Sequence, residues 1–213
     1  MRSVKVQLVQ FAIAAVVVLA CFVPSFAQAG TATLAGGKTS VTLSTDFVGD
    51  LTTLGVAPDR VSPAKLKRGI ASFPIPSGAL DLSTAKGEID HTGGLTLTAG
   101  STRVQLLNFV IDTTGTTPVL TGLVVVNGTL LGRLPLFDLA LPALTLPIQP
   151  GANGRVTIGN VGVTLTETAA GALNQVFGVT AFVKGFNIGT AVVDATPGAP
   201  KTGKRAAETE SEE

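Results

Sequence analysis

Most of the side chains that catalysis and metal binding require are scarce or missing in this sequence. Its 213 residues contain no Trp, no Tyr, one Cys and one His, and only 14% are charged. A zinc shell needs several His or Cys ligands, and a Ser or Thr nucleophile needs a His base oriented by a carboxylate. The sequence has no Gly-x-Ser-x-Gly turn and no phosphate loop with Walker spacing. We therefore predict no catalytic residues, no metal site, no cofactor and no enzymatic activity.

Charge is also nearly balanced. The 15 Lys and Arg residues offset the 14 Asp and Glu residues, which leaves a net charge of +1 at pH 7. A near-neutral chain offers no electrostatic basis for binding nucleic acid. The mean hydropathy of +0.48 is too high for a disordered chain, and the length is that of one globular domain with short end segments.

The first 29 residues have the pattern of a signal peptide. Arg2 and Lys5 precede an uncharged apolar run from Leu8 to Val23, and Ala27-Gln28-Ala29 supplies the small residues of a cleavage site before Gly30. The run is shorter than the roughly 20 residues of a membrane span. The sequence therefore predicts a secreted or extracytoplasmic protein with no membrane span after cleavage.

Cys21 leaves a second interpretation of this segment open. Val18-Leu19-Ala20-Cys21 is similar to a bacterial lipoprotein box, in which cleavage leaves a lipidated cysteine at the new N-terminus. The apolar residues after Cys21 and the downstream cleavage site favour ordinary secretion. Cleavage before Gly30 would remove this cysteine, so the fold would depend on its core without a disulfide.

The rest of the chain, from residue 30 to residue 194, is typical of a single β-rich domain. Thr, Val, Leu and Gly dominate, and residues alternate between apolar and polar at 94–98, 103–106 and 155–165. Residues 120–126 are more continuously apolar and indicate a central strand. We predict a mainly β fold, an antiparallel sheet of sandwich-like or barrel-like form.

Two short helices are expected within this β domain. One begins near Thr45 and ends at Gly55, and the other begins near Thr166 or Thr168 and ends at Gly178. Val41-Thr42-Leu43 recurs as Val163-Thr164-Leu165, 122 residues later, just before the second helix. We predict two pseudo-repeated strand–helix–strand units, although Thr- and Val-rich strands also resemble one another by composition alone.

Residues 195–213 have a different composition. A Pro- and Gly-containing start is followed by three basic residues and then by four glutamates, without apolar periodicity. This pattern predicts a disordered charged tail.

The segment from Leu134 to Ile148 combines closely spaced leucines with four prolines up to Pro150. Proline removes a backbone donor, so this segment is expected to be an edge strand or an extended stretch that covers the core. The alternative is an apolar groove that binds a lipid, a peptide or a partner strand. Its candidate ligand-binding residues are Leu134, Leu136, Phe137, Leu139 and Leu141.

His91 is the one histidine and the one weak candidate for a cofactor-binding residue. It follows Glu88 and Asp90, but successive strand residues point to opposite faces, so Asp90 and His91 would diverge. We expect His91 to be a polar residue in a turn.

A partial family resemblance adds to this interpretation. Phe73-Pro74-Ile75-Pro76-Ser77-Gly78-Ala79-Leu80-Asp81, Gly93-Gly94-Leu95 and the strand from Val104 to Asp112 resemble the HtaA-type domain over about residues 70–127. The resemblance implies an extracytoplasmic β module of actinobacterial type, some members of which bind haem. Those members use a tyrosine as the iron ligand, and this sequence has none, so no haem ligand carries over.

Two functions follow from these observations. The first is an exported, non-catalytic β domain with a structural or interaction role at the bacterial cell envelope or outside the cell. The alternative is a carrier of a hydrophobic ligand or haem, related to HtaA-type proteins. The expected partner is accordingly an unknown protein or a hydrophobic ligand.

Overall fold

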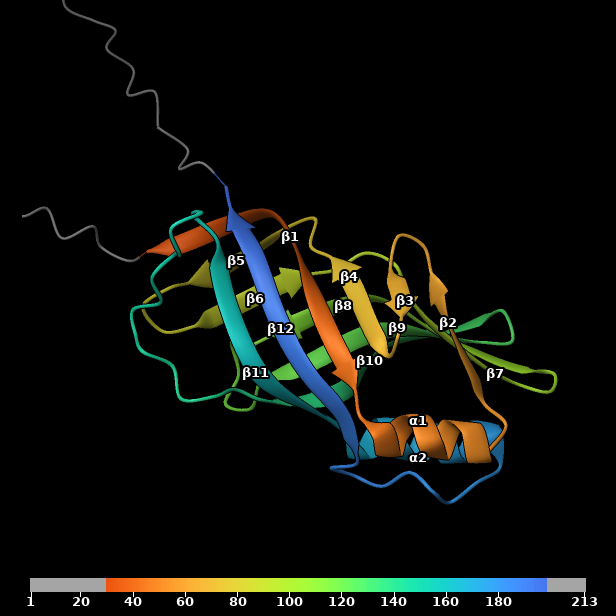
Figure 1. The fold of residues 1–213 in the computed structure, drawn as a ribbon. Helices are drawn as coiled ribbons and strands as arrows, with labels where there is room; N and C mark the ends of the chain where they lie inside the picture. The colour runs from red at the N-terminus through yellow and green to blue at the C-terminus, as the bar shows by residue number, and fades with distance from the viewer. Residues whose placement is uncertain (1–29, 199–213) are drawn as a thin grey trace, which may run out of the picture.

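The computed structural model describes residues 30–198, where the chain forms twelve strands and two helices (Figure 1). The expected signal peptide, Cys21 and most of the expected charged tail lie outside the described residues. The mainly β fold with two short helices is confirmed. In chain order the elements are β1 (Thr31–Leu43), α1 (Thr45–Thr53), β2 (Ala57–Val61), β3 (Lys65–Lys67), β4 (Ile70–Pro74), β5 (Gly78–Asp81), β6 (Lys86–Asp90), β7 (Gly94–Ala99), β8 (Thr102–Asp112), β9 (Val119–Val126), β10 (Thr129–Ala140), β11 (Val156–Leu165), α2 (Glu167–Phe177) and β12 (Asn187–Pro197).

The strands pair antiparallel and, in the described residues, eight of them close into a barrel. The order is β12, β11, β10, β9, β8, β6, β5 and β1, and β1 then pairs with β12. Closure leaves no free edge along this ring where the pairing is continuous. The sandwich-like or barrel-like prediction is therefore resolved in favour of a barrel.

The barrel wall divides toward one end because two strands change partners along their length. β1 pairs with β5 through residues 31–34 and with β4 through residues 38–42. β8 pairs with β6 through residues 110–112 and with β7 through residues 102–107, on either side of a bulge at Asn108. The wall is thus closed by β5 and β6 at one end, whereas β4 and β7 diverge at the other.

Both helices begin with a capped first turn. The side chains of Ser44 and Thr166 accept hydrogen bonds from the backbone N–H groups of Phe47 and Ala169, which satisfies one free donor in each helix. The two caps are 122 residues apart, and α2 ends at Gly178 with a φ of 67°. β12, the strand after α2, pairs with β11, the strand before it. β4, which follows α1 only after β2 and β3, pairs with β1.

The core fills the barrel and the space under the helices. Along β11, Val156, Ile158, Val161, Val163 and Leu165 are buried, and the alternation shifts by one residue at an irregularity between Ile158 and Val161. Neither helix in the described part of the chain is long and apolar enough to cross a membrane.

Two expectations about boundaries and edges need correction. The domain does not end at residue 194, because β12 continues to Pro197 and Ala195 is fully buried against β1 and β11. The segment from Leu134 is also not a simple edge, because Phe137 and Asp138 of β10 pair with both β9 and β11. Pro135 is tolerated in β10 because it lies at an irregularity of the β9–β10 pairing. It also precedes the residues of β10 that pair with β11.

Candidate ligand-binding site

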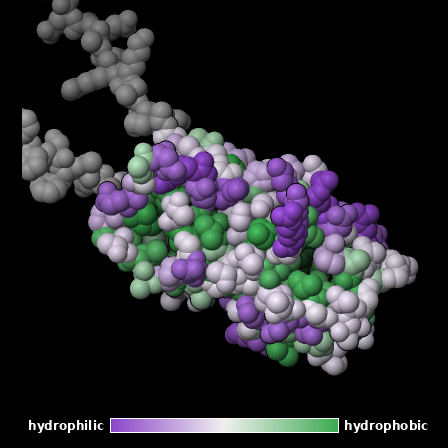
Figure 2. Space-filling view, viewed as in Figure 1, coloured by the Kyte–Doolittle hydropathy of each residue, from purple (hydrophilic) through white to green (hydrophobic). Residues whose placement is uncertain are grey.

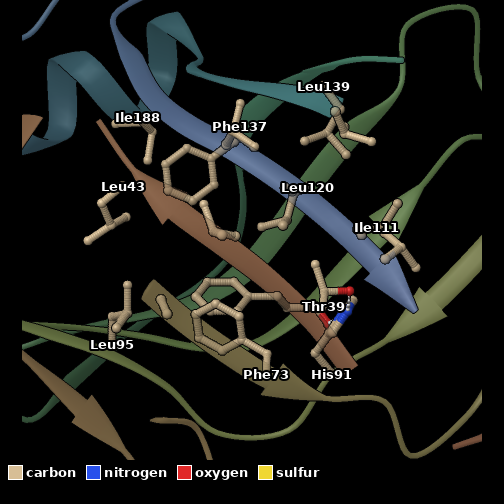
Figure 3. Close-up of a pocket in the computed structure, with 17 residues that line it drawn as sticks. Thr39, Leu43, Phe73, His91, Leu95, Ile111, Leu120, Phe137, Leu139 and Ile188 are labelled. Atoms are coloured by element: carbon tan, nitrogen blue, oxygen red, sulfur yellow. Dashed lines mark hydrogen bonds between the residues drawn. The ribbon is translucent and has the colours of Figure 1, made fainter. Parts of the chain in front are cut away.

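An apolar cavity occupies the interior of the barrel near the point where the wall divides. Seventeen residues from β1, β4, β7 to β12 and the β6–β7 connection line it (Figure 3). Their side chains are apolar except for Thr39 and His91. The centre of a water molecule can occupy about 50 Å³ of this space, so the cavity is narrow. A dry apolar space of this kind accommodates apolar groups better than water.

His91 lies at one side of the cavity and is only 4% exposed. Its Nε2 is 2.7 Å from the hydroxyl oxygen of Thr39, and its Nδ1 is 3.3 Å from the carbonyl oxygen of Phe109. Burial lowers the pKa of the imidazole to about 4, although the Phe109 carbonyl and the Asp90 carboxylate both favour the charged form. The ring is therefore neutral at physiological pH.

The partners of His91 also determine its tautomer. A carbonyl oxygen can only accept, so Nδ1 carries the proton and donates to Phe109, and Nε2 accepts from the Thr39 hydroxyl. Both ring nitrogens are thus occupied within the protein. The sequence predicts that His91 is a polar residue in a turn. The residue is buried instead, because the β6–β7 connection places it inside the barrel.

The carboxylates near His91 in the sequence do not share its site. Glu88 and Asp90 line a shallow surface groove on β5 and β6, and Asp90 accepts a hydrogen bond from the hydroxyl of Ser77. His91 faces the interior instead. The structure therefore separates these carboxylates from the histidine, as the strand alternation indicates.

Three of the lining side chains are partly exposed and mark the mouth of the cavity. These are Leu43 at the end of β1, Leu95 at the start of β7 and Phe137 on β10; the other lining residues are buried. In Figure 3, Leu43 and Leu95 lie across the cavity from Thr39 and His91. Figure 2 shows a hollow bordered by apolar atoms above α1, between β4 and β2. The cavity thus reaches the surface where the wall divides.

Phe137 separates this cavity from a second one beneath α2. The second cavity is formed by β8, β9, β10 and α2, is also apolar, and includes Leu134, Leu136 and Phe137 in its lining. Leu139 faces the first cavity and, with Leu141, a smaller space at the other end of the barrel. The five candidates from the Leu134–Ile148 segment therefore lie at three apolar cavities and do not form one groove.

Most of the cavity lining could not be recognised from the sequence. Phe73 and Phe109 form an edge-to-face pair with ring centroids 5.0 Å apart, and small side chains at Ala71 and Ala191 leave space beside them. Each of these residues has the pattern of an ordinary core residue in an alternating strand. Nothing local in the sequence shows that β4, β8 and β12 would bring them together.

The fold is similar to that of several solved domains from one bacterium. No protein-family model matches the sequence, and no curated protein matches it. The C-terminal domain of HtaA from Corynebacterium glutamicum is 19% identical, with a TM-score of 0.61 over 78% of this chain and 99% of that one. The N-terminal domain of the same protein is 14% identical, with a TM-score of 0.59 over 78% and 99%.

A third solved structure is the haem-binding protein HtaB from the same organism. It is 12% identical, with a TM-score of 0.52 over 79% of this chain and 96% of that one. The TM-scores show a similar fold, and identities this low do not transfer a ligand. The described residues of this chain therefore form an HtaA-like β-barrel domain.

Proposed function

We propose that this chain is an exported, non-catalytic domain that binds a hydrophobic small molecule inside its barrel. The observation that carries the proposal is the apolar cavity, which opens between Leu43, Leu95 and Phe137 at the divided end of the wall. The similar fold of HtaB, a haem-binding protein, supports a ligand-binding role for such a barrel. The lack of a second His and of any Tyr supports a carrier over an enzyme.

The residues present do not fit a haem whose iron is bound by the protein. The sequence has no Tyr, and its Met1 and Cys21 lie outside the described residues. His91 is buried, and both of its ring nitrogens are hydrogen-bonded to Thr39 and Phe109. We therefore propose a ligand that is held by apolar contact, without a bond between iron and a side chain.

Ligand entry must widen the cavity. Sites for drug-sized ligands enclose roughly 300–1,000 Å³, well above the space available here. The mouth residues are the partly exposed ones, and β4 and β7 are not hydrogen-bonded to each other across the divided wall. Movement of Leu95, Phe137 and the segments next to them would enlarge the site without breaking the closed ring of strands.

The test of this proposal is a titration with 1-N-phenylnaphthylamine, an uncharged probe that fluoresces in apolar surroundings. We expect saturable binding to the wild-type chain. Ala191→Leu places a larger side chain into the cavity and should weaken binding by about tenfold or more, with Ala191→Val giving a smaller effect. The matched control is Val192→Leu, because Val192 is exposed on the outer face of β12.

Two results would contradict the proposal. One is an absence of saturable probe fluorescence with the folded wild-type chain. The other is an equal loss of binding in Ala191→Leu and Val192→Leu, since position 192 does not face the cavity. Circular dichroism melts of each variant show that the folded chain is being compared.

Export is tested by the mass of the protein that accumulates outside the producing cell. We expect a chain that begins at Gly30, because the small residues at 27–29 form the cleavage site. A mass that begins at a lipidated Cys21 would support the lipoprotein alternative. A chain that still begins at Met1 would contradict cleavage of the signal peptide.

A role as an interaction module at the cell envelope is the second candidate. It is favoured by Leu130 and Leu131, which are 60% and 53% exposed on a part of β10 that pairs with β9 alone. Exposed leucines on a strand whose other edge is free suit a protein partner. This function becomes the stronger candidate if the apolar probe does not bind.

A further inference from the structure

A short segment connects the two sides of the divided wall beside the mouth of the cavity. Residues 57–67, which we call the strap, contain β2 and β3, and Ser62, Pro63 and Ala64 connect the two strands. β2 pairs with β7, on one side of the divided wall, and β3 pairs with β4 on the other. Ala64 is buried and lies close to Gly93, so the strap is anchored at its centre.

Strand pairing determines which strap side chains face the mouth. Arg60 pairs directly with Leu95, and directly opposed residues in antiparallel strands project from the same face. Leu95 lines the cavity mouth, so Arg60 is the strap cation on that face. Lys67 pairs with the exposed Ile70, one residue away from the cavity-lining Ala71, and so belongs to the outer face.

Arg60 has no acidic partner in the described part of the chain. The one ion pair within residues 30–198 joins Arg155 to Asp194, far from the strap in the sequence. Asp59, the acidic residue of the strap, pairs with Thr96 and therefore projects from the other face. Lys65, Lys67 and Arg68 add positive charge nearby, and hydrophilic side chains lie over β3 beside the hollow in Figure 2.

The geometry points to an amphiphilic ligand whose carboxylate contacts Arg60 at the mouth while its apolar body enters the barrel. This inference rests on the proposed function and specifies its ligand class. A charged group cannot enter the cavity without a large desolvation cost, because the lining offers only apolar side chains and the paired Thr39 and His91. At the mouth, an exposed guanidinium can bind a carboxylate with two parallel hydrogen bonds.

The test compares cis-parinaric acid, a fluorescent fatty acid, with its uncharged methyl ester. We measure the Kd of each probe for the wild-type chain, Arg60→Gln and Lys67→Gln. Both substitutions remove one positive charge from the strap, but only Arg60 faces the mouth. Arg60→Gln should raise the Kd of the acid by about five- to tenfold and leave the Kd of the ester within about twofold. Lys67→Gln should leave the Kd of both probes within about twofold.

Protoporphyrin IX and its dimethyl ester form a second pair of probes and distinguish a ring-shaped body from a linear one. The inference is supported if Arg60→Gln weakens binding of the free acid, but not of its ester, in either pair. The pair that shows this selective loss of affinity identifies the apolar body of the ligand. An equal loss of affinity for the free acid in Arg60→Gln and Lys67→Gln would overturn the inference, because the net positive charge of the strap would then explain the binding. An equal loss of affinity for the acid and the ester in Arg60→Gln would also overturn the inference, because Arg60 would then contribute through packing and not through its charge.

The outcomes separate this inference from the proposed function. If 1-N-phenylnaphthylamine binds and Arg60→Gln leaves the acids unaffected, the cavity binds apolar ligands and the carboxylate assignment is wrong. If neither the uncharged probe nor the acids bind the folded wild-type chain, the proposed function itself fails. Arg60 is exposed, so both strap variants should melt near the wild-type temperature.

Discussion

Phe182→Ala should lower the free energy of unfolding by about 3–5 kcal/mol, the cost of removing a buried aromatic ring and leaving a cavity. Phe182 is 2% exposed, and its ring packs edge-to-face against Phe186 with centroids 5.9 Å apart. Phe186 in turn contacts Phe47 of α1, at 6.3 Å. The ring at position 182 therefore connects the segment before β12 to the core beneath α1.

The backbone around Phe182 makes collapse of that cavity difficult. The side-chain amide of Asn174, on α2, donates to the carbonyl oxygen of Phe182 and accepts from its N–H. These two hydrogen bonds hold the segment in place after the ring is removed. Because the backbone cannot move inward to fill the space, we expect a loss toward the upper part of that range.

Urea denaturation measures this effect as a lower midpoint with an unchanged slope. The matched control is Val183→Ala, because Val183 is the next residue along and is 58% exposed. That variant should change the free energy of unfolding by less than about 0.5 kcal/mol. If Phe182→Ala lowered the free energy of unfolding by less than about 1 kcal/mol, Phe182 would not be a buried core residue.

His91 should make the fold sensitive to mild acid. Its pKa is about 4 in the folded chain, against 6.5 for an unperturbed histidine, because burial disfavours the charged ring. The unfolded chain therefore takes up a proton first as the pH falls. This difference lowers the free energy of unfolding by less than about 0.5 kcal/mol above pH 6.5. The loss grows as the pH falls and reaches about 2–3 kcal/mol near pH 4.5.

His91→Gln separates this contribution from the other titrations. The Gln amide has no charge to gain and can still hydrogen-bond Thr39. Between pH 8 and pH 4.5 the variant should therefore lose about 2–3 kcal/mol less free energy of unfolding than the wild type loses. Hydrogen bonds from Ser83 and Thr114 lower the pKa values of Asp81 and Asp112. The stability that these carboxylates add is lost only below their usual range near 3.8, outside the pH window of His91.

Urea titrations at several pH values measure the two profiles. Parallel profiles for wild type and His91→Gln would contradict a buried, neutral His91. Binding of the uncharged probe should be independent of pH above 6.5, since the ring stays neutral throughout that range.

Local patterns predicted the parts of the fold that depend on neighbouring residues. The alternation from Arg155 to Leu165 indicated a strand, and β11 spans Val156–Leu165. Thr166 or Thr168, and Gly178, indicated the ends of the second helix because a hydroxyl can cap free N–H groups and a glycine adopts positive φ without strain. The structure has the cap at Thr166. The mainly β character follows from the same alternation and from the frequency of Thr, Val and Leu.

The site could be predicted only in part, for the same reason. The leucines after residue 133 indicated buried apolar surface, and Leu136 and Leu139 are buried. The sequence did not indicate that Phe137 lies between two cavities, nor that β10 would acquire β11 as a second neighbour. A proline-rich segment looks the same in sequence whether the strand beside it ends or a partner arrives from elsewhere in the chain.

By itself, then, the sequence determined the β class, both helices and the scarcity of His, Cys and Tyr, and it predicts export. The tertiary structure decided that β1 and β12 close the barrel although more than a hundred residues separate them, that His91 turns inward, and that Arg60 faces the mouth. Each of these depends on which distant strands pair and in what register. Pairing is set by the burial of many side chains at once, so a local pattern of residues cannot specify it.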